Sequence, residues 1–154
     1  MKLSSPFKYL VSILFLFQVG LDMDASADDN PTYNVIDFGA VPDGKTLNTQ
    51  AIQNTIDAAY KNGGGRVVFP EGRFLSGSIV LKNGVELYLD GEATLLGSTN
   101  PVHYKEMNNW RALILAENAS KIAIKGKGTI DGQGRALALN ADSLHHIGEL
   151  VDPR

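Results

Sequence analysis

The side chains that could carry chemistry in this sequence are a few carboxylates, three histidines and a small set of aromatic rings. Asp131 is followed by Gly132 and could be a catalytic acid, but an Asp beside glycine more often accepts hydrogen bonds from turn amides. His145 and His146 are adjacent and have no third ligand in register, so we expect them to be solvated. The sequence therefore predicts no metal site and no cofactor.

Aromatic side chains gather in the segment 98–111. His103, Tyr104 and Trp110 combine an apolar ring with a polar edge, which suits contact with a sugar ring, and loops on a rigid scaffold often carry function. We therefore take these three residues as candidate substrate-binding residues. The alternative is that Trp110 only seals the segment against the rest of the fold.

The elements that position these residues follow a repeat. Within 121–134, apolar residues alternate around a glycine corner at Gly126 and Gly128, as expected of two short strands with a sharp bend. The same apolar and Gly positions recur earlier. Leu87, Leu89, Thr94 and Leu95 lie 35 positions before Ile122, Ile124, Thr129 and Ile130, and 20 positions after Val67, Phe69, Phe74 and Leu75.

A strand-rich period in the low twenties is typical of a solenoid in which each repeat is one turn. We predict an all-β fold of parallel strands stacked in three turns, at 66–77, 78–97 and 112–132, with 98–111 as an insertion. The inward residues would form apolar columns. An antiparallel meander with accidental spacing is the alternative, and it leaves the matched glycines unexplained.

One amphipathic helix precedes the repeats. Ala51, Ile52, Thr55 and Ile56 recur at helical spacing, with Asn48 or Thr46 as N-cap. We predict that this helix caps the first turn, because the end of a solenoid exposes apolar surface and strand edges. Before it we expect a strand at 33–36 and a turn at 42–45.

Residues 135–154 look loop-like, with no strand pattern and nothing to cap the third turn. Three turns are close to the minimum for a stable stack. We therefore expect this chain to be the front portion of a longer polypeptide, truncated at its C-terminal end and monomeric at full length.

The N-terminus predicts secretion. Lys2 and Lys8 precede a short apolar run, and Ala25-Ser26-Ala27 follows it, as in a signal peptide. Residues 1–27 are the expected signal peptide, with cleavage between Ala27 and Asp28, leaving 28–154 as one domain that is extracellular or periplasmic and not anchored in a membrane. The net charge of −3 predicts no nucleic-acid partner, and the chain has no cysteine.

Four motifs resemble one known family. The segments 36–44, 48–53, 63–72 and 126–134 are similar to the opening of the pectin-degrading right-handed parallel β-helix proteins, and most of all to glycoside hydrolase family 28, the polygalacturonases and their rhamnogalacturonan-cleaving relatives. The resemblance covers nearly all of 33–134. It implies a right-handed coil and a pectic polysaccharide substrate.

The resemblance also implies a reaction, the hydrolysis of α-1,4-galacturonosidic or related linkages with inversion and without a metal. Such hydrolysis uses carboxyl groups about 6.5–9.5 Å apart. The family carries them in Asn-Thr-Asp and Asp-Asp motifs, assisted by Gly-His-Gly and Arg-Ile-Lys. Here Asn48-Thr49 is followed by Gln50, the one Asp-Asp is Asp28-Asp29, and the other two motifs are absent. No catalytic residue can be assigned, so we expect the chain alone to be inactive.

Two other functions remain open on the same scaffold. A polysaccharide lyase would act by β-elimination, usually with calcium. A non-enzymatic adhesin or tailspike-like module would continue the coil without a carboxylate cluster. Fold alone does not choose among these.

Overall fold

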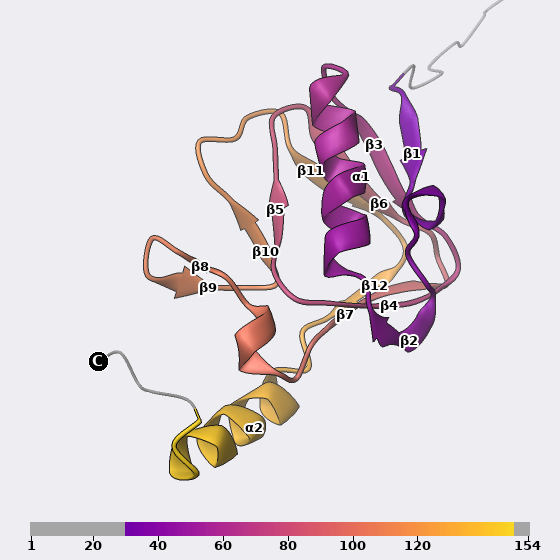
Figure 1. Cartoon of the computed structure of the whole chain (residues 1–154). Helices are drawn as coiled ribbons and strands as arrows, with labels where there is room; N and C mark the ends of the chain where they lie inside the picture. The colour runs from indigo at the N-terminus through magenta and orange to yellow at the C-terminus, as the bar shows by residue number, and fades with distance from the viewer. Residues whose placement is uncertain (1–29, 150–154) are drawn as a thin grey trace, which may run out of the picture.

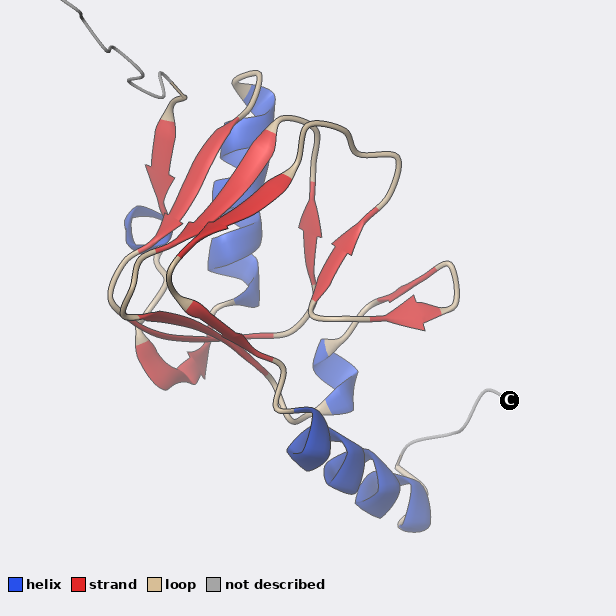
Figure 2. Cartoon of the chain, turned by 180° about the vertical axis from the view of Figure 1, so that it is seen from behind, coloured by secondary structure: helices blue, strands red, loops and turns tan. Residues whose placement is uncertain are grey.

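The computed structural model describes residues 30–149. The predicted signal peptide and its cleavage site at Ala27 and Asp28 lie outside the described residues. The chain winds as a right-handed parallel β-helix, and successive turns stack on one another (Figures 1 and 2). The fold class predicted from the repeat is confirmed.

Two four-stranded parallel sheets form the main walls of the coil. In spatial order the first sheet contains β1 (Thr32–Asn34), β3 (Gly65–Phe69), β6 (Val85–Leu89) and β11 (Ala123–Gly126). The second contains β2 (Asp43–Leu47), β4 (Gly72–Ser76), β7 (Ala93–Gly97) and β12 (Thr129–Asp131). A third wall is formed by β5 (Ile79–Leu81) and β10 (Ile114–Ala116), also parallel.

In each of the two four-stranded sheets, the predicted spacing is correct for one pair of strands and wrong for another. Val67 pairs with Leu87, which is the expected step of 20, but Leu87 pairs with Ile124 and not with Ile122. In the second sheet Thr94 pairs with Thr129, the expected step of 35, whereas Phe74 pairs with Leu95, a step of 21. The errors arise because the corners between strands differ in length by one or two residues from turn to turn. A single repeat length along the sequence cannot describe such differences.

The core consists of columns of inward side chains. Val67 and Leu87 are fully buried, as are Phe74 and Leu95 in the second sheet. Phe69 and Phe74 meet edge to face across the corner between β3 and β4, with ring centroids 5.6 Å apart. The last members of two columns are more exposed: Ile124 retains 46% and Ile130 43% of its surface, although each pairs with a buried leucine.

Helix α1 (Thr49–Lys61) stands against the stack, as Figure 1 shows, and buries Ile52, Ile56 and Ala59. Its polar side protects a strand edge. Gln53 Oε1 accepts a hydrogen bond from the Val80 N–H at 2.8 Å, and Gln53 Nε2 donates to Val80 O at 3.1 Å. The side-chain amide thus takes the place of a neighbouring strand beside β5. The predicted helix exists, and its contacts agree with a capping role.

Two local predictions before α1 need correction. The predicted strand at 33–36 ends at Asn34 and is followed by a 3-10 helix, η1 (Val35–Phe38). The predicted turn at 42–45 lies within β2, where Asp43 Oδ1 accepts hydrogen bonds from the N–H groups of Lys45 and Thr46. The turn chemistry is present, but it makes an irregularity in a strand that pairs with β4 at both ends.

Asn48 occupies the N-cap position, but its side chain does not cap the helix. Asn48 Oδ1 accepts from the Val41 N–H at 2.7 Å, while Nδ2 donates to the carbonyl oxygens of Val41 and Thr46 at 2.9 Å. Asn48 is 2% exposed. The buried side chain therefore bonds the backbone of the preceding loop, at Val41 and Thr46, in place of the helix end.

The loop-like prediction for 135–154 is wrong over its first part, since α2 (Gly134–His146) begins directly after the third turn. Alanine and leucine favour helices, and Leu137, Ala141 and Leu144 have helical spacing that the search for strand patterns missed. None of its described residues is buried. In Figure 1 α2 projects away from the stack.

The glycine corner that indicated the repeat joins β11 to β12. The carbonyl oxygen of Leu89, on the turn before, accepts hydrogen bonds from the N–H groups of Lys127 and Gly128 at 3.1 and 3.2 Å. Gly126 has φ +105°, and a Cβ there would collide with the Leu89 carbonyl. Glycine is required because the two corners approach without space for a side chain.

We predict that Gly126→Ala lowers the free energy of unfolding by about 3 kcal/mol, from left-handed strain and the backbone collision. Gly134→Ala is the matched control, since a Cβ at Gly134 meets no atom within 4 Å and alanine favours a helix. Urea denaturation of both variants measures the difference. Equal stability of the two variants would contradict the close approach.

Candidate functional site

The insertion between β7 and β10 carries the three candidate residues. It contains the short helix η2 (Pro101–His103) and a hairpin of β8 (Glu106–Met107) and β9 (Trp110–Arg111). Two asparagines with positive φ, Asn108 and Asn109, make the two-residue turn of this hairpin. Such turns need φ > 0 at both central positions, which asparagine tolerates. The sequence thus builds a hairpin that projects from the coil (Figure 1).

His103 and Tyr104 are both tied to Ser98 at the base of the insertion. His103 Nδ1 lies 2.7 Å from Ser98 Oγ, and the Tyr104 hydroxyl donates to Ser98 O at 2.7 Å. Burial raises the pKa of the Tyr104 hydroxyl. Since Ser98 is only 3% exposed, these contacts fix the shape of the loop. The side chains of both candidates therefore make hydrogen bonds to the protein itself.

Trp110 is different because it is 73% exposed at the start of β9. Its neighbour Arg111 is paired with Glu106 across the hairpin at 3.1 Å. The interpretation that Trp110 seals the insertion does not fit this exposure. The structure therefore places His103 and Tyr104 at the base of the insertion and Trp110 on its projecting hairpin.

The insertion borders an apolar cavity of about 390 Å³ beside α2. The ring of Tyr104 lines it together with Pro101, Leu113, Leu137 and Ala141. Asn140 Nδ2 donates to Thr99 O at 2.9 Å and holds α2 near this loop. Of the three predicted contact residues, Tyr104 is the one that reaches this cavity.

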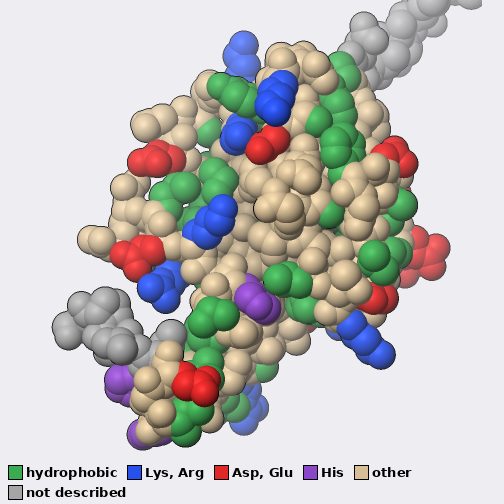
Figure 3. Space-filling view, in the orientation of Figure 1, with side chains coloured by type: hydrophobic (Ala, Val, Ile, Leu, Met, Phe, Trp, Pro, Cys, Tyr) green, Lys and Arg blue, Asp and Glu red, His purple; other side chains and the backbone are tan. Residues whose placement is uncertain are grey.

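Charged side chains are dispersed over the surface. Figure 3 shows acidic and basic groups interspersed on the face that includes α1, without a single-sign field. The described helices are all too short or too polar to cross a membrane. Within residues 30–149, no three His, Asp or Glu side chains are grouped so that they could hold a metal ion.

A cluster of charged side chains lies on the outer face of the first sheet. Glu86 Oε1 contacts Arg66 Nε at 2.6 Å, and Glu86 Oε2 contacts Lys125 Nζ at 2.6 Å. Arg66 also lies over the Tyr88 ring, 4.8 Å from its centroid. The Glu86 side chain is 9% exposed. The cluster links three successive turns, because its members come from β3, β6 and β11.

The electrostatics of this cluster keep Glu86 ionised. Burial by itself would raise the pKa of Glu86, but hydrogen bonds from Lys125 and Arg66 outweigh burial and hold the pKa below its ordinary value of 4.5. The pKa values of Asp43 and Asp57 are lowered as well. A general acid needs a raised pKa, so none of these three carboxyl groups has the environment of one.

The remaining candidates from the sequence have structural surroundings. Asp131 Oδ1 accepts a hydrogen bond from the Gln133 N–H at 2.9 Å, so the prediction that it caps a turn is confirmed. The rings of His145 and His146 are tilted, with centroids 6.4 Å apart, and His146 Nε2 lies 3.6 Å from Asp142 Oδ2. Neither arrangement forms a reactive centre.

Sequence reasoning missed Glu86, although the signal was present. The step of 20 that pairs Val67 with Leu87 also pairs Arg66 with Glu86. An opposite-charge pair at the repeat distance predicts a contact between turns.

The stacked parallel turns define the class of protein, a right-handed parallel β-helix. Residues 32–138 match the family model described as rhamnogalacturonase A/epimerase, pectate lyase-like. The chain belongs to this family, within the pectate-lyase-like superfamily that contains the pectin-degrading glycoside hydrolases.

Three similar proteins are informative. An exo-poly-alpha-D-galacturonosidase of Dickeya chrysanthemi is 37% identical over 135 residues, covering 77% of this chain and 22% of the enzyme. A putative glycosyl hydrolase structure from Parabacteroides merdae matches with TM-score 0.74 and 35% identity, over 79% of this chain and 53% of that one. A family 28 exopolygalacturonase structure from Yersinia enterocolitica matches with TM-score 0.59 and 39% identity, over 67% of this chain and 21% of that one. The chain thus spans about a fifth of the length of the two named galacturonan-degrading enzymes.

We predict that Glu86→Gln lowers the free energy of unfolding at pH 7 by about 2 kcal/mol, because two cations lose a largely buried partner. Since the pKa of Glu86 is lowered on folding, its stabilisation is complete well above pH 4.5 and is lost as the pH falls through the folded-state pKa. In denaturation experiments between pH 3 and pH 7, the free energies of unfolding of the variant and the unaltered chain should therefore differ most at pH 7 and approach each other towards pH 3.

The matched control is Glu106→Gln, which removes one side of the exposed pair with Arg111, whose side chains are 49% and 45% exposed. An exposed pair contributes about 0.5 kcal/mol or less. If both variants lose the same stability, the burial of Glu86 is not what strengthens its cluster.

Proposed function

We propose that this chain is the N-terminal part of a secreted glycoside hydrolase that cleaves α-1,4-galacturonosidic or related rhamnogalacturonan linkages of pectin with inversion. The observation that carries the proposal is the match of residues 32–138 to the family, on a stack of parallel turns. The named activity of the Dickeya relative supports the substrate class.

In this proposal the chain supplies architecture and a substrate contact, while the reacting carboxyl groups lie on other turns of the whole protein. The downward pKa shifts of Asp43, Asp57 and Glu86 support this division. Each of them already accepts hydrogen bonds from amide, guanidinium or ammonium groups. Such carboxylates stay ionised at neutral pH and have no proton to give to a leaving oxygen.

Trp110 is the proposed substrate contact. The exposed indole on the hairpin presents a flat apolar face to the C–H groups of a sugar. His103 and Tyr104 bond to Ser98 and so fix the shape of the insertion. They are expected to influence substrate binding indirectly, by positioning the loop that carries Trp110.

The isolated chain, residues 28–154, is expected to release no reducing sugar from polygalacturonate. A chimera in which it replaces the matching segment of the Dickeya enzyme is expected to release it, because the turns would then support the missing catalytic groups. Activity of the isolated chain, or a folded but inactive chimera, would contradict the proposal. Formation of unsaturated uronates by the isolated chain would instead indicate the lyase alternative, and a folded chimera that binds polygalacturonate without releasing any product would indicate an adhesin.

Trp110→Ala is expected to weaken the retention of the chain on immobilised polygalacturonate about tenfold, the equivalent of roughly 1.4 kcal/mol. Trp110→Phe is the matched control and should keep most of the binding, since the ring is retained. Affinity electrophoresis of the three proteins measures the effect. Unchanged retention of the alanine variant would remove Trp110 from the substrate contact.

A further inference from the structure

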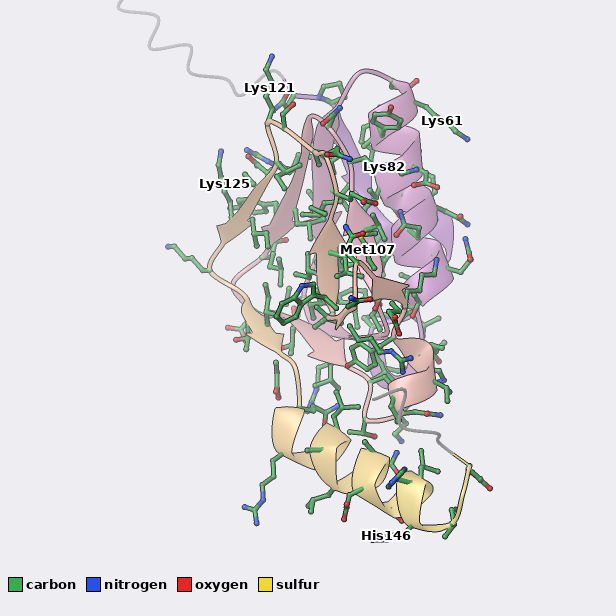
Figure 4. The ribbon with its side chains drawn as sticks, turned by 90° about the vertical axis from the view of Figure 1, so that its left-hand side faces the viewer. Lys61, Lys82, Met107, Lys121, Lys125 and His146 are labelled. Atoms are coloured by element: carbon green, nitrogen blue, oxygen red, sulfur yellow. The ribbon has the colours of Figure 1, made fainter. Side chains whose placement is uncertain are left out.

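A second cavity, open to solvent, is lined in part by the hairpin residue Met107. It has a volume of about 410 Å³, within the usual range of small-ligand sites. Its walls come from four segments far apart in the sequence. They include Tyr60 of α1, Lys82 and Asn83 after β5, Met107 of the hairpin, and the loop residues Glu117 and Asn118. Figure 4 shows Lys82 beside α1, with Met107 lower on the same face.

The cation in this cavity is held in place before any ligand arrives. Lys82 Nζ lies 2.7 Å from Asp57 Oδ1 and 5.4 Å from the centroid of the Tyr60 ring. Asp57 in turn accepts a hydrogen bond from Gln53 Nε2 at 2.9 Å. Because an ammonium group has three donors, Lys82 can bond a ligand without leaving Asp57.

The opposite wall is held by the hairpin turn. Asn108 Nδ2 donates to Glu117 Oε1 at 2.9 Å, which leaves Glu117 Oε2 able to accept a further bond. Asn118 follows with φ +50° and gives the loop its sharp bend. Asn83 Oδ1 accepts from the Ser120 N–H at 2.6 Å, so the side-chain group of Asn83 that can still bond a ligand is its amide NH₂.

These groups select among possible ligands by charge. Lys82 is paired with Asp57, which Lys61 also attracts, whereas the opposite wall presents the carboxylate of Glu117, so an anion beside that wall is disfavoured. Hydroxyl groups both donate and accept, and they match a wall that offers ammonium, amide and carboxylate groups. Tyr60 and Met107 add apolar surface for C–H groups.

We propose that this cavity is a binding site for a neutral sugar residue, separate from the contact assigned to Trp110. The site discriminates against uronic acids, because Glu117 repels the uronate carboxylate. It does not depend on which reaction the whole protein catalyses, since it needs only the cavity of this chain.

The test compares methyl α-D-galactoside with methyl α-D-galacturonide, which differ only in the carboxylate at C6. Each is titrated into the isotopically labelled chain, residues 28–154, and the backbone amide shifts are followed by NMR. We expect the galactoside to bind about tenfold more tightly, with shifts centred on Lys82, Asn83, Glu117 and Asn118. Equal or tighter binding of the galacturonide, binding of neither, or shifts centred on Trp110 would overturn the proposal.

Three variants assign the selectivity to its residues. Glu117→Gln should reduce the preference for the galactoside to about threefold or less, because it removes the repelling charge and keeps the shape. Tyr60→Ala should weaken galactoside binding about tenfold. Lys127→Met, an exposed residue of the corner between β11 and β12, is the control and should change neither value. An unchanged preference in Glu117→Gln would refute the role of Glu117.

The outcomes separate this site from the proposed function. Tyr60→Ala should leave retention on polygalacturonate unchanged, although it weakens galactoside binding. Failure of the galactoside titration would remove the cavity site and leave the family assignment and the Trp110 contact untouched.

Discussion

The fold depends on hydrogen bonding between successive turns of a coil. Each strand must find a parallel neighbour on the turn before it, and the first turns need a substitute for the neighbour that would precede them. Gln53 supplies this substitute beside β5, where its side-chain amide bonds both backbone groups of Val80. The same demand brings the corners together so closely that Gly126 faces the Leu89 carbonyl.

The stack also determines where chemistry can occur. Inward positions are filled by apolar columns, so polar groups act on the outer faces and in the loops that leave the coil. The Arg66–Glu86–Lys125 cluster connects three turns on the outer face of the first sheet. The insertion is a long loop that leaves the coil and exposes Trp110 to solvent. The charge cluster stabilises the scaffold. The insertion projects beyond the scaffold, because its strands β8 and β9 pair with each other and not with strands of the neighbouring turns.

The insertion borders both cavities and also carries Trp110. Its base, fixed through Ser98, lines the apolar cavity with Tyr104, and its hairpin contributes Met107 to the polar one. A parallel β-helix is a general scaffold that serves several activities in its superfamily. We infer that the particular specificity of this chain arises in the insertion, 98–111, and in the facing side of α1, where side chains from distant turns converge.

The sequence by itself determined the period, the parallel coil, the capping helix and the turn role of Asp131, because each depends on local patterns of apolar, polar and glycine residues. Tertiary structure decided the register of Leu87 against Ile124, the ties of His103 and Tyr104 to Ser98, and the cavity between Tyr60 and Glu117. These features depend on how many residues each corner absorbs and on which distant segments then meet. A linear pattern does not contain that information, since it records spacing along the chain and not across the turns.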